Sequence, residues 1–372
     1  HLHREAGRSV IDARNGGHEE PWQSLLSPGA FEHAYVYFTS GSTGVPKGIL
    51  GTHRGLAHFV VWQRDRFDIG PGDRVALLKT ISFDPVLREV FTPLIAGATI
   101  CVPPTALEAR DVVPWIRSSG VTIFQATPAL GEIWRGEMAD ETRIPSVRLL
   151  MFAGEILTGS LVGAWREVVE PWCEIVNMYG PTETTMVKTY HVVAAQEDTL
   201  GIVPVGRPLP NSQAIVVSNE RLCGIGEPGE VLLRTRAGTA GYINNAAAQA
   251  AAFIPNPFTG DPDDVVYRTG DRGYLNADGT LTVTGRIDNQ VKVLGVRIEL
   301  GEVAAHIRQH PGIESVAVVP DQGNGTAITL TAHVVADTED VDATVLRRHL
   351  LDRLPRSMIP SRFVFRDALP LT

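Results

Sequence analysis

The sequence lacks several features that would assign it to particular classes of protein. Its 372 residues include three cysteines, which lie far apart and lack the paired spacing of a disulfide framework or a zinc site. No run of 18 or more apolar residues occurs, and the N-terminal residues contain no apolar signal core. The sequence therefore predicts a protein of the reducing cytoplasm that has no membrane partner.

The sequence also lacks an excess of basic residues. Its 33 lysines and arginines are outnumbered by 42 aspartates and glutamates, which gives a formal net charge of −9. A nucleic-acid partner is not expected, because such a partner needs a basic face, whereas a small anionic ligand needs only a local positive site. Apolar residues make up 44% of the chain, enough for a sizeable core, and the length suggests two or three folding units.

The first part of the chain alternates between short apolar runs and helical patterns. Strands are expected at residues 34–38, 74–78, 99–102, 121–125, 149–152 and 174–177. Helices are expected at residues 54–66, 85–95, 111–118, 129–136 and 160–169. This alternation predicts parallel βαβ units in a layered α/β fold.

The pattern changes after about residue 200. Short strands separated by glycine-containing turns, which are typical of antiparallel sheets, are expected at residues 203–208, 214–218, 230–234, 272–276 and 281–285. Beyond Asp288, strands at 315–319 and 329–335 alternate with helices at 300–309 and 341–353. We therefore expect a large N-terminal domain of layered sheets and helices, followed by a small α+β domain.

Residues 37–48, with the sequence YFTSGSTGVPKG, place a loop of small and hydroxyl-bearing residues directly after an expected strand. Small residues let backbone N–H groups approach phosphate oxygens, hydroxyls add donors, and Lys47 adds a positive charge. The string is not a Walker A loop, because Gly48 follows the lysine and no serine or threonine is there to hold magnesium. A flexible surface turn is the alternative interpretation of such a loop.

Residues 177–185, with the sequence NMYGPTETT, combine an aromatic ring, hydroxyls and a carboxylate. A tyrosine ring can stack on a purine, a hydroxyl can reach a phosphate, and a carboxylate can hold a hard cation that bridges phosphate oxygens. The alternative is a turn in which Glu183 is a solvated charge. Two more strings follow: YRTGD at 267–271, whose aspartate is otherwise a turn residue or helix cap, and GRIDNQVKVLGVRIE at 285–299.

These four strings, in this order, closely resemble the motifs of the adenylate-forming superfamily, which includes acyl-CoA synthetases, luciferases and the adenylation domains of nonribosomal peptide synthetases. A fifth string, LPRSMIP at 354–360, extends the resemblance over nearly the whole chain. The resemblance implies a large N-terminal subdomain at 1–287 and a small C-terminal subdomain at 288–372. It implies an enzyme that uses ATP and Mg²⁺ to activate a carboxylic acid, most typically an amino acid, and passes the acyl group to the phosphopantetheine thiol of a carrier protein.

The resemblance assigns the triphosphate of ATP to the first two strings. Lys47 is implied to contact the β- and γ-phosphates, Thr182 the α-phosphate, and Glu183 is the implied metal ligand. A carboxylate that attacks the α-phosphorus meets negative charge, so catalysis is expected to consist of alignment and charge neutralisation. The implied catalytic residues are Lys47, Glu183 and Arg286.

The nucleoside is assigned to the later strings. Tyr179 is implied to lie against the adenine and Asn177 near its edge, whereas Asp271 would accept hydrogen bonds from both ribose hydroxyls. Arg286 would contact ribose and phosphate, and Asp288 is the implied hinge of the small subdomain. The full set of implied nucleotide-binding residues is Thr39, Ser40, Gly41, Thr43, Gly44, Lys47, Asn177, Tyr179, Gly180, Thr182, Asp271 and Arg286.

Residues 83–89, with the sequence FDPVLRE, are implied to select the substrate. The resemblance places Asp84 where amino-acid-activating domains hold the substrate ammonium, although an aspartate before Pro85 is an equally good helix N-cap. Arg88 lies on the same helical face and, if buried, needs an anion, which favours a substrate with a side-chain carboxylate such as α-aminoadipate or glutamate. The implied pocket consists of Phe83, Asp84, Pro85, Arg88, Gln125, Met151, Ala153, Met178, Met186 and Val187, whose three methionines form a large apolar wall that fits a small diacid poorly.

Two alternatives stay open. An acyl- or aryl-CoA ligase would share the strings, although Asp84 and the QVK sequence at 290–292 are more typical of carrier-loading enzymes; Gly295 lies on the loop implied to line the pantetheine tunnel. A catalytically silent ATP-binding protein is the second alternative. Family members carry a longer segment before the first string and continue after Thr372 to a lysine that contacts the substrate. We therefore expect truncation at both ends and weak adenylation with nucleotide binding retained.

Overall fold

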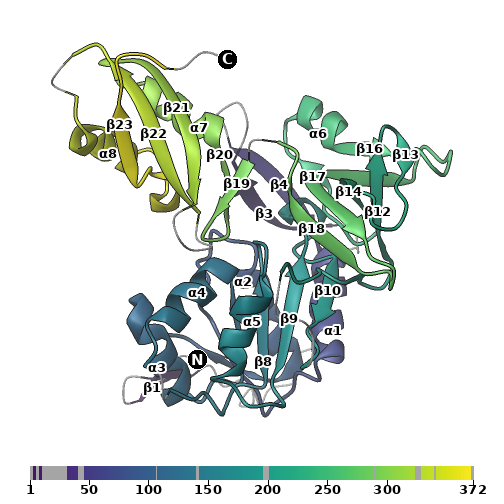
Figure 1. Ribbon diagram of the computed structural model, residues 1–372. Helices are drawn as coiled ribbons and strands as arrows, with labels where there is room; N and C mark the ends of the chain where they lie inside the picture. The colour runs from purple at the N-terminus through teal and green to yellow at the C-terminus, as the bar shows by residue number, and fades with distance from the viewer. Residues whose placement is uncertain are drawn as a thin grey trace.

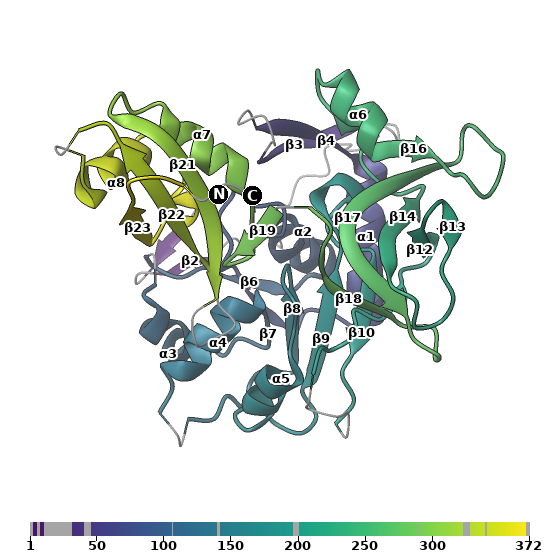
Figure 2. The same cartoon turned by 45° about the horizontal axis from the view of Figure 1, so that its top comes forward.

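The fold is described from a computed structural model, which defines residues 3–5, 8–10, 32–40, 46–105, 107–139, 142–195, 201–288, 290–322, 328–338 and 341–369. A layered α/β group, an antiparallel sheet and a small C-terminal group of elements lie around a central region (Figures 1 and 2). Near the N-terminus, β1 (His3–Glu5) pairs antiparallel with β2 (Arg8–Val10). Within the described residues, no helix is long and apolar enough to cross a bilayer.

A largely parallel sheet forms the layered group. Its strands run in the order β11-β10-β9-β8-β7-β5-β6, and the last five pair in parallel. The strands are β5 (Arg74–Ala76), β6 (Thr99–Cys101), β7 (Ile123–Ala126), β8 (Leu149–Ala153), β9 (Glu174–Tyr179), β10 (Thr189–Val192) and β11 (Arg207–Pro208). The helices that connect or flank them are α1 (His53–Arg66), α2 (Val86–Ala96), α3 (Ala109–Ser118), α4 (Pro128–Gly136) and α5 (Gly159–Arg166).

Both faces of this sheet are buried, because its side chains alternate between two hydrophobic clusters. Ile123, Leu149 and Val176 pack with residues of α1 and α2. Phe124, Leu150 and their neighbours pack with residues of α3, α4 and α5 on the other face. A polar side chain on the first face of β7, β8 or β9 is therefore directed toward α1 and α2.

Threonine side chains cap three of these helices. The threonines are Thr52 before α1, Thr127 before α4 and Thr158 before α5. Each side-chain oxygen accepts a hydrogen bond from the backbone N–H group three residues later in the sequence. Such caps satisfy one of the N–H groups that a helix start leaves without an intrahelical partner. They fix where each helix begins after its strand or loop.

An antiparallel sheet follows in the order β13-β12-β14-β17-β16, with β18 paired to β17. Its strands are β12 (Ser212–Ser218), β13 (Arg221–Leu222), β14 (Gly229–Thr235), β16 (Phe253–Pro255), β17 (Val265–Leu275) and β18 (Leu281–Arg286). A second small sheet joins β3 (His33–Thr39), β4 (Lys47–Thr52) and β15 (Gly241–Tyr242). The helix α6 (Ala246–Ala252) and the short turn η2 (Thr182–Thr184) complete this part of the chain.

The C-terminal group has a hydrophobic cluster of its own, drawn from residues between Val293 and Met358. The hairpin of β19 (Gln290–Val293) and β20 (Val296–Glu299) turns through Leu294 and Gly295, which have φ values of 51° and 81° as a two-residue type I′ turn requires. It is followed by α7 (Leu300–Arg308), β21 (Ile313–Gln322), β22 (Ile328–Ala336), α8 (Ala343–Leu351), η3 (Arg356–Met358) and β23 (Arg362–Phe365).

The parallel α/β and later antiparallel organisation expected from the sequence is confirmed, with several changed boundaries. The strand expected at 74–78 ends at Ala76, because the N–H groups of Leu78 and Lys79 donate to the Glu89 carboxylate at 2.9 Å. The strand expected at 203–208 is reduced to β11, since the N–H groups of residues 205 and 206 donate to the Leu281 carbonyl instead. The strand expected at 272–276 is the second half of the longer β17.

Candidate functional site

The hairpin β3–β4 brings the two ends of the first string together. Thr39 and Lys47 lie opposite each other in its antiparallel register. The Ser40 hydroxyl, at the end of β3, donates to the backbone carbonyl of Arg297 at 2.8 Å. The Lys47 ammonium lies 5.6 Å from the centre of the Tyr242 ring. The remaining predicted members of this loop lie outside the described residues: Gly41, Thr43 and Gly44.

The second string leaves β9 and reverses sharply at η2. The Asn177 amide nitrogen donates to the carbonyls of Val203 and Pro204 at 3.1 and 3.0 Å, while its oxygen is buried without a hydrogen-bond partner among the described residues. Gly180 is needed at this reversal, because a Cβ there would lie 2.2 Å from the Met186 carbonyl oxygen. Before this turn, at the end of β9, Asn177 Oδ1 is a hydrogen-bond acceptor that is not used within the described residues.

Glu183 is buried, with 1% of its surface exposed. Its Oε1 accepts hydrogen bonds from the Tyr242 hydroxyl at 2.8 Å and from Arg297 at 2.9 Å. Its Oε2 has no hydrogen-bond partner in the described part of the chain. Burial raises the pKa of Glu183. The Arg297 charge and the hydroxyls of Tyr242 and Tyr267 outweigh this effect and hold the pKa below its usual range. Glu183 is therefore an ionised carboxylate with one unused oxygen.

A cross-strand pair joins the third and fourth strings, because Asp271 on β17 is opposite Arg286 on β18. Arg286 donates to Asp271 Oδ1 at 2.7 Å and makes two bonds of 2.6 Å to the Asp288 carboxylate. The Tyr179 hydroxyl donates to Asp271 Oδ2 at 2.6 Å. Burial raises the pKa of Asp288, but hydrogen bonds from Arg286 outweigh it and leave the pKa below its usual range. The predicted hinge residue thus contacts the same guanidinium as the predicted ribose residue.

These strings share one cavity of about 490 Å³. Asn177, Tyr179, Gly180, Asp271 and Arg286 all contribute to its wall. Lys47 and Glu183 are not among the lining residues of this cavity, but Tyr242 links them: its hydroxyl donates to Glu183, and its ring centre lies 5.6 Å from the Lys47 ammonium. We call the cavity together with Glu183 and Lys47 the central cleft. The cavity thus brings together residues of the second, third and fourth strings, whereas the role of Lys47 stays a prediction.

The hairpin β19–β20 closes one side of the central cleft. Its Gly295 N–H donates to the Glu155 carboxylate at 2.6 Å, and a Cβ on Gly295 would lie 2.3 Å from the Thr127 methyl group. Lys292 lines the cavity together with Glu155. Burial lowers the pKa of Lys292, against the attraction of Asp271 and Glu155. A glycine is thus required at the point where the hairpin meets the layered group.

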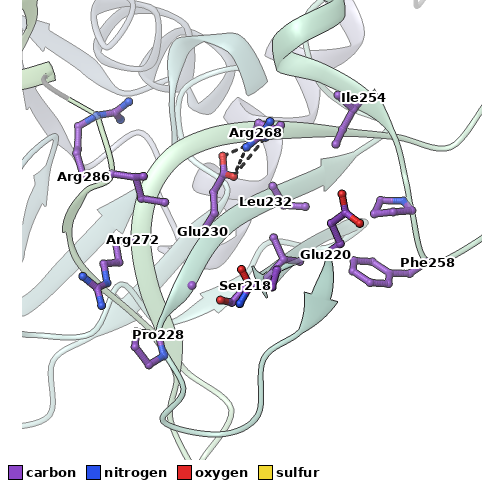
Figure 3. A pocket seen from close by; sticks show the side chains of 15 residues that line it. Ser218, Glu220, Pro228, Glu230, Leu232, Ile254, Phe258, Arg268, Arg272 and Arg286 are labelled. Carbon is purple, nitrogen blue, oxygen red and sulfur yellow. Dashed lines mark hydrogen bonds and ion pairs between the residues drawn. The ribbon is translucent and has the colours of Figure 1, made fainter.

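A larger hollow of about 1090 Å³ lies over the antiparallel sheet (Figure 3). Arg268, in its wall, donates to the Glu230 carboxylate at 2.7 Å, as the dashed lines show. Of the predicted site residues, Arg286 borders this hollow. The central cleft is the better candidate site, because Arg268 is already paired with Glu230 and because four other predicted nucleotide-binding residues line the cavity of the cleft: Asn177, Tyr179, Gly180 and Asp271.

The strand register brings the predicted pocket residues to one face of the parallel sheet. Gln125 on β7 is opposite Met151 on β8, and Ala153 is opposite Met178 on β9. This is the face that packs against α1 and α2, where Met186 also lies. We call the following set the strand pocket: Phe83, Asp84, Pro85, Arg88, Gln125, Met151, Ala153, Met178, Met186 and Val187.

Asp84 does not cap a helix. The helix α2 begins at Val86 with Pro85 at the N-cap, and no side chain bonds to its first N–H groups. The Asp84 carboxylate instead accepts a hydrogen bond from Thr182. Burial raises the pKa of Asp84 to about 6, although the Thr182 hydrogen bond and the Arg88 charge oppose the rise. The helix-cap interpretation is therefore wrong, and the Asp84 side chain faces the turn that carries Glu183.

Arg88 and Gln125 are buried with unused hydrogen-bonding atoms. Arg88 is 3% exposed, donates to the Met178 sulfur at 3.4 Å, and has no partner for Nε among the described residues. Both amide atoms of Gln125, which is 1% exposed, also have no partner there. Burial lowers the pKa of Arg88 to about 10, against the charges of Glu89 and Asp84. An unsatisfied buried polar group is costly, so these atoms point to a ligand.

Several residues of the central cleft were not predicted from the sequence. Arg297 belongs to the fourth string, but nothing in the string indicates that its side chain reaches Glu183. Tyr242 and Glu155 lie outside every string. Lys292 lies within the fourth string without a predicted role. The alternation of apolar Val296 and Ile298 with charged residues along β20 is a signal that could have marked Arg297 as facing away from the core of the hairpin.

Comparison with known proteins decides the family. The model of the AMP-binding enzyme family matches residues 9–243, and that of the AMP-binding enzyme C-terminal domain matches residues 302–372. The chain belongs to the AMP-binding enzyme family. Within the described residues, the two matches leave the hairpin β19–β20 between them, where the fourth string lies.

The relatives of this AMP-binding chain include much longer proteins. It is 37% identical over 344 residues to the dimodular nonribosomal peptide synthase of Bacillus subtilis, covering 91% of this chain and 14% of that protein. It is 32% identical over 393 residues to the L-2-aminoadipate reductase of Schizosaccharomyces pombe, covering 90% of this chain and 27% of that protein. The chain therefore spans a minor part of each.

Among solved structures, the Vibrio cholerae adenylation domain AlmE in complex with glycyl-adenosine-5'-phosphate aligns with a TM-score of 0.82 and 28% identity. The alignment covers 92% of this chain and 65% of that chain. The predicted resemblance to adenylation domains of nonribosomal peptide synthetases, with a large and a small domain, is confirmed.

Proposed function

We propose that this chain activates an amino acid with ATP as aminoacyl-AMP and transfers it to the phosphopantetheine thiol of a carrier protein. The observation that carries the proposal is the central cleft, in which Asn177, Tyr179, Asp271 and Arg286 line one cavity beside Glu183. The similarity to a nonribosomal peptide synthase and to an adenylation domain solved with glycyl-adenosine-5'-phosphate supports the same activity.

The nucleoside half of the cleft suits a purine riboside. The unused Asn177 Oδ1 is an acceptor for the exocyclic amine of adenine, and the buried Tyr179 ring offers an aromatic face. Asp271 already accepts one bond at each oxygen, but each oxygen has a second lone pair for a ribose hydroxyl. Lys47 and Ser40 flank the loop between β3 and β4. In this proposal, Lys47 neutralises charge on the phosphates and Ser40 holds them.

The residues at Glu183 fit a magnesium ion. Its Oε2 is a buried carboxylate oxygen with no partner among the described residues, and carboxylate oxygen is a preferred ligand of Mg²⁺. No group of three or more potential protein ligands occurs in the described part of the chain, as expected where substrate phosphates supply the other oxygens. When bound, the ion would neutralise charge on the phosphates during attack by the substrate carboxylate.

The strand pocket suits an amino acid whose side chain carries an acceptor. Asp84 is the anion for the substrate ammonium, and its bond from Thr182 links it to the turn that carries Glu183. Arg88 Nε and Gln125 Nε2 are the unsatisfied donors that a side-chain carboxylate would satisfy. A relative named for L-2-aminoadipate is consistent with this class of substrate. Met151 and Met178 supply an adaptable apolar wall for the aliphatic part.

We further propose that the chain divides near Asp288, with the small unit rotating about it, and that the protein acts in the cytoplasm. The separate hydrophobic cluster between Val293 and Met358 supports the division. The three cysteines are free in the structure, which is consistent with a reducing compartment.

An amino-acid-dependent ATP–pyrophosphate exchange screen tests the activity. We expect exchange with one class of amino acid, and strongest exchange with acidic ones. Loading should then be compared between CoA and a phosphopantetheinylated carrier, and transfer to the carrier is expected to dominate. Calorimetric titration with ATP and Mg²⁺ shows separately whether the protein binds nucleotide, which identifies a protein that binds ATP without catalysing the reaction. Nucleotide binding without exchange for any acid would contradict the proposal, and efficient transfer to CoA would favour the CoA ligase alternative.

A further inference from the structure

Arg297 lies in the phosphate half of the central cleft although it belongs to the β19–β20 hairpin. Its guanidinium donates to Glu183 Oε1 at 2.9 Å, and the two side chains are 20% and 1% exposed. Its Nε donates to the Gln290 side chain at 2.7 Å, and its carbonyl accepts from the Ser40 hydroxyl. One residue thus contacts both the proposed metal ligand and the proposed phosphate-binding hairpin.

This contact competes with a metal ion. Glu183 Oε1 already accepts from Tyr242 as well as from Arg297, so a cation can approach without displacement only at Oε2. Two positive groups that contact the same carboxylate repel each other, and the repulsion grows with the double charge of a magnesium ion and with the exclusion of water from a buried site. The Arg297–Glu183 ion pair therefore opposes the binding of a divalent cation to the same carboxylate.

The nucleoside half of the cleft shows no such obstruction. The cavity of about 490 Å³ lies against Asn177, Tyr179 and Asp271, which are the proposed contacts of adenine and ribose. Beside Glu183, in contrast, Oε1 is already occupied by the Arg297 guanidinium at 2.9 Å. The nucleoside contacts are therefore open, while the proposed metal ligand is already paired with a protein cation.

We propose that Arg297 is a positioning residue that competes with Mg²⁺ for Glu183, so that the protein with this ion pair formed binds magnesium-bound ATP more weakly than it would without the Arg297 charge. The inference rests on the proposed function. It assigns the competition to one ion pair between the β19–β20 hairpin and the proposed metal ligand.

The test is calorimetric titration of the intact chain with α,β-methylene-ATP and Mg²⁺, and separately with AMP. Arg297→Gln keeps a side chain of similar polarity but removes the charge. We expect it to bind the magnesium-bound analogue about tenfold more tightly than the unsubstituted protein, a typical size for coupling between exclusive ligands. Binding of AMP without metal should change little. Arg234→Gln is the matched control, because it also removes an arginine–carboxylate pair, with Asp264 at 2.5 Å, on the antiparallel sheet.

Hydrogen exchange gives a second measurement that needs no variant. Exchange of the β19–β20 amides is expected to speed up when the unsubstituted protein binds the magnesium-bound analogue and to slow down when it binds AMP. The inference is overturned if Arg297→Gln binds the magnesium-bound analogue no more tightly, or if both nucleotides change the amide exchange in the same direction. Absence of any nucleotide binding would instead remove the proposed function itself.

Discussion

The central cleft and the strand pocket differ in how their polar groups are satisfied. In the cleft, charged side chains from distant segments pair with one another, as Arg286 does with Asp271 and Arg297 with Glu183. In the strand pocket, Arg88 Nε and the Gln125 amide are buried without partners among the described residues. The charged groups of the cleft are thus largely paired before ligand binds, although Asn177 Oδ1 and Glu183 Oε2 lack partners there, whereas the pocket needs its ligand to satisfy a guanidinium and an amide.

The first test of this difference removes the positive charge of Lys47, which is the proposed contact of the phosphates. Lys47→Met should lower the rate of ATP–pyrophosphate exchange by about 10²–10³-fold, because an electrostatic contact to the reacting phosphates is lost. The affinity for AMP, measured by calorimetry, should hardly change, since the nucleoside contacts lie on other strands. Equal losses for AMP and ATP would show that the cleft is not organised in separate halves.

The second test removes the proposed anion of the strand pocket. Asp84→Asn should raise the amino-acid KM in the exchange assay by about a hundredfold, because a buried charge pair is broken, while ATP affinity is retained. Since burial raises the pKa of Asp84 to about 6, the carboxylate loses its charge as the pH falls through that value. The amino-acid KM of the unsubstituted protein should therefore rise below about pH 6, and that of Asp84→Asn should stay flat. A flat profile in both proteins would argue against this role.

The third test concerns selectivity. Arg88→Met should lower kcat/KM for acidic amino acids by about tenfold relative to leucine, because hydrogen bonds to a charged group are lost. Methionine keeps the volume and matches the neighbouring Met178, so the fold should survive, which a thermal melt would check. An unchanged preference for acidic amino acids would mean that Arg88 is only a structural residue of α2.

The last test concerns stability rather than activity, and its subject is Lys188. This fully buried ammonium donates to the backbone carbonyls of Thr185 and Val187, and no carboxylate lies within ion-pair distance of it in the described part of the chain. Burial lowers the pKa of Lys188 to about 7. Because the unfolded chain then binds more protons between about pH 7 and 10.5, stability rises with pH over that range.

Lys188→Met should therefore raise the free energy of unfolding at pH 7 by about 2 kcal/mol, since the cost of a buried cation is removed. The gain should shrink as the pH approaches 10, which urea denaturation at several pH values would measure. A gain that is independent of pH would trace the effect to packing rather than to charge.

The same comparison explains how much could be predicted from the sequence. The strings of the central cleft could be recognised because each is a continuous run of residues, although the roles of those residues came from the family resemblance. The strand pocket was predictable only by resemblance, since Gln125, Met151 and Met178 come from separate strands and meet through the sheet register.

What the sequence did not indicate depends on contacts between segments. The approach of Arg297 to Glu183 requires the hairpin to close on the cleft, and no local pattern specifies that orientation. The role of Asp84 was ambiguous locally, because an aspartate before proline suits a helix cap. The structure excludes the cap, since no side chain bonds to the first N–H groups of α2, whereas the role of Asp84 in substrate binding stays a prediction.

Arg286 has a further consequence for engineering this chain. A guanidinium offers five N–H donors in a rigid plane, and three hydrogen bonds already tie it to the carboxylates of Asp271 and Asp288. A lysine at this position would keep the positive charge but could not span both carboxylates in one plane. Arg286 thus links Asp271, the proposed ribose contact, to Asp288, the proposed hinge, and even an Arg286→Lys exchange should weaken that link.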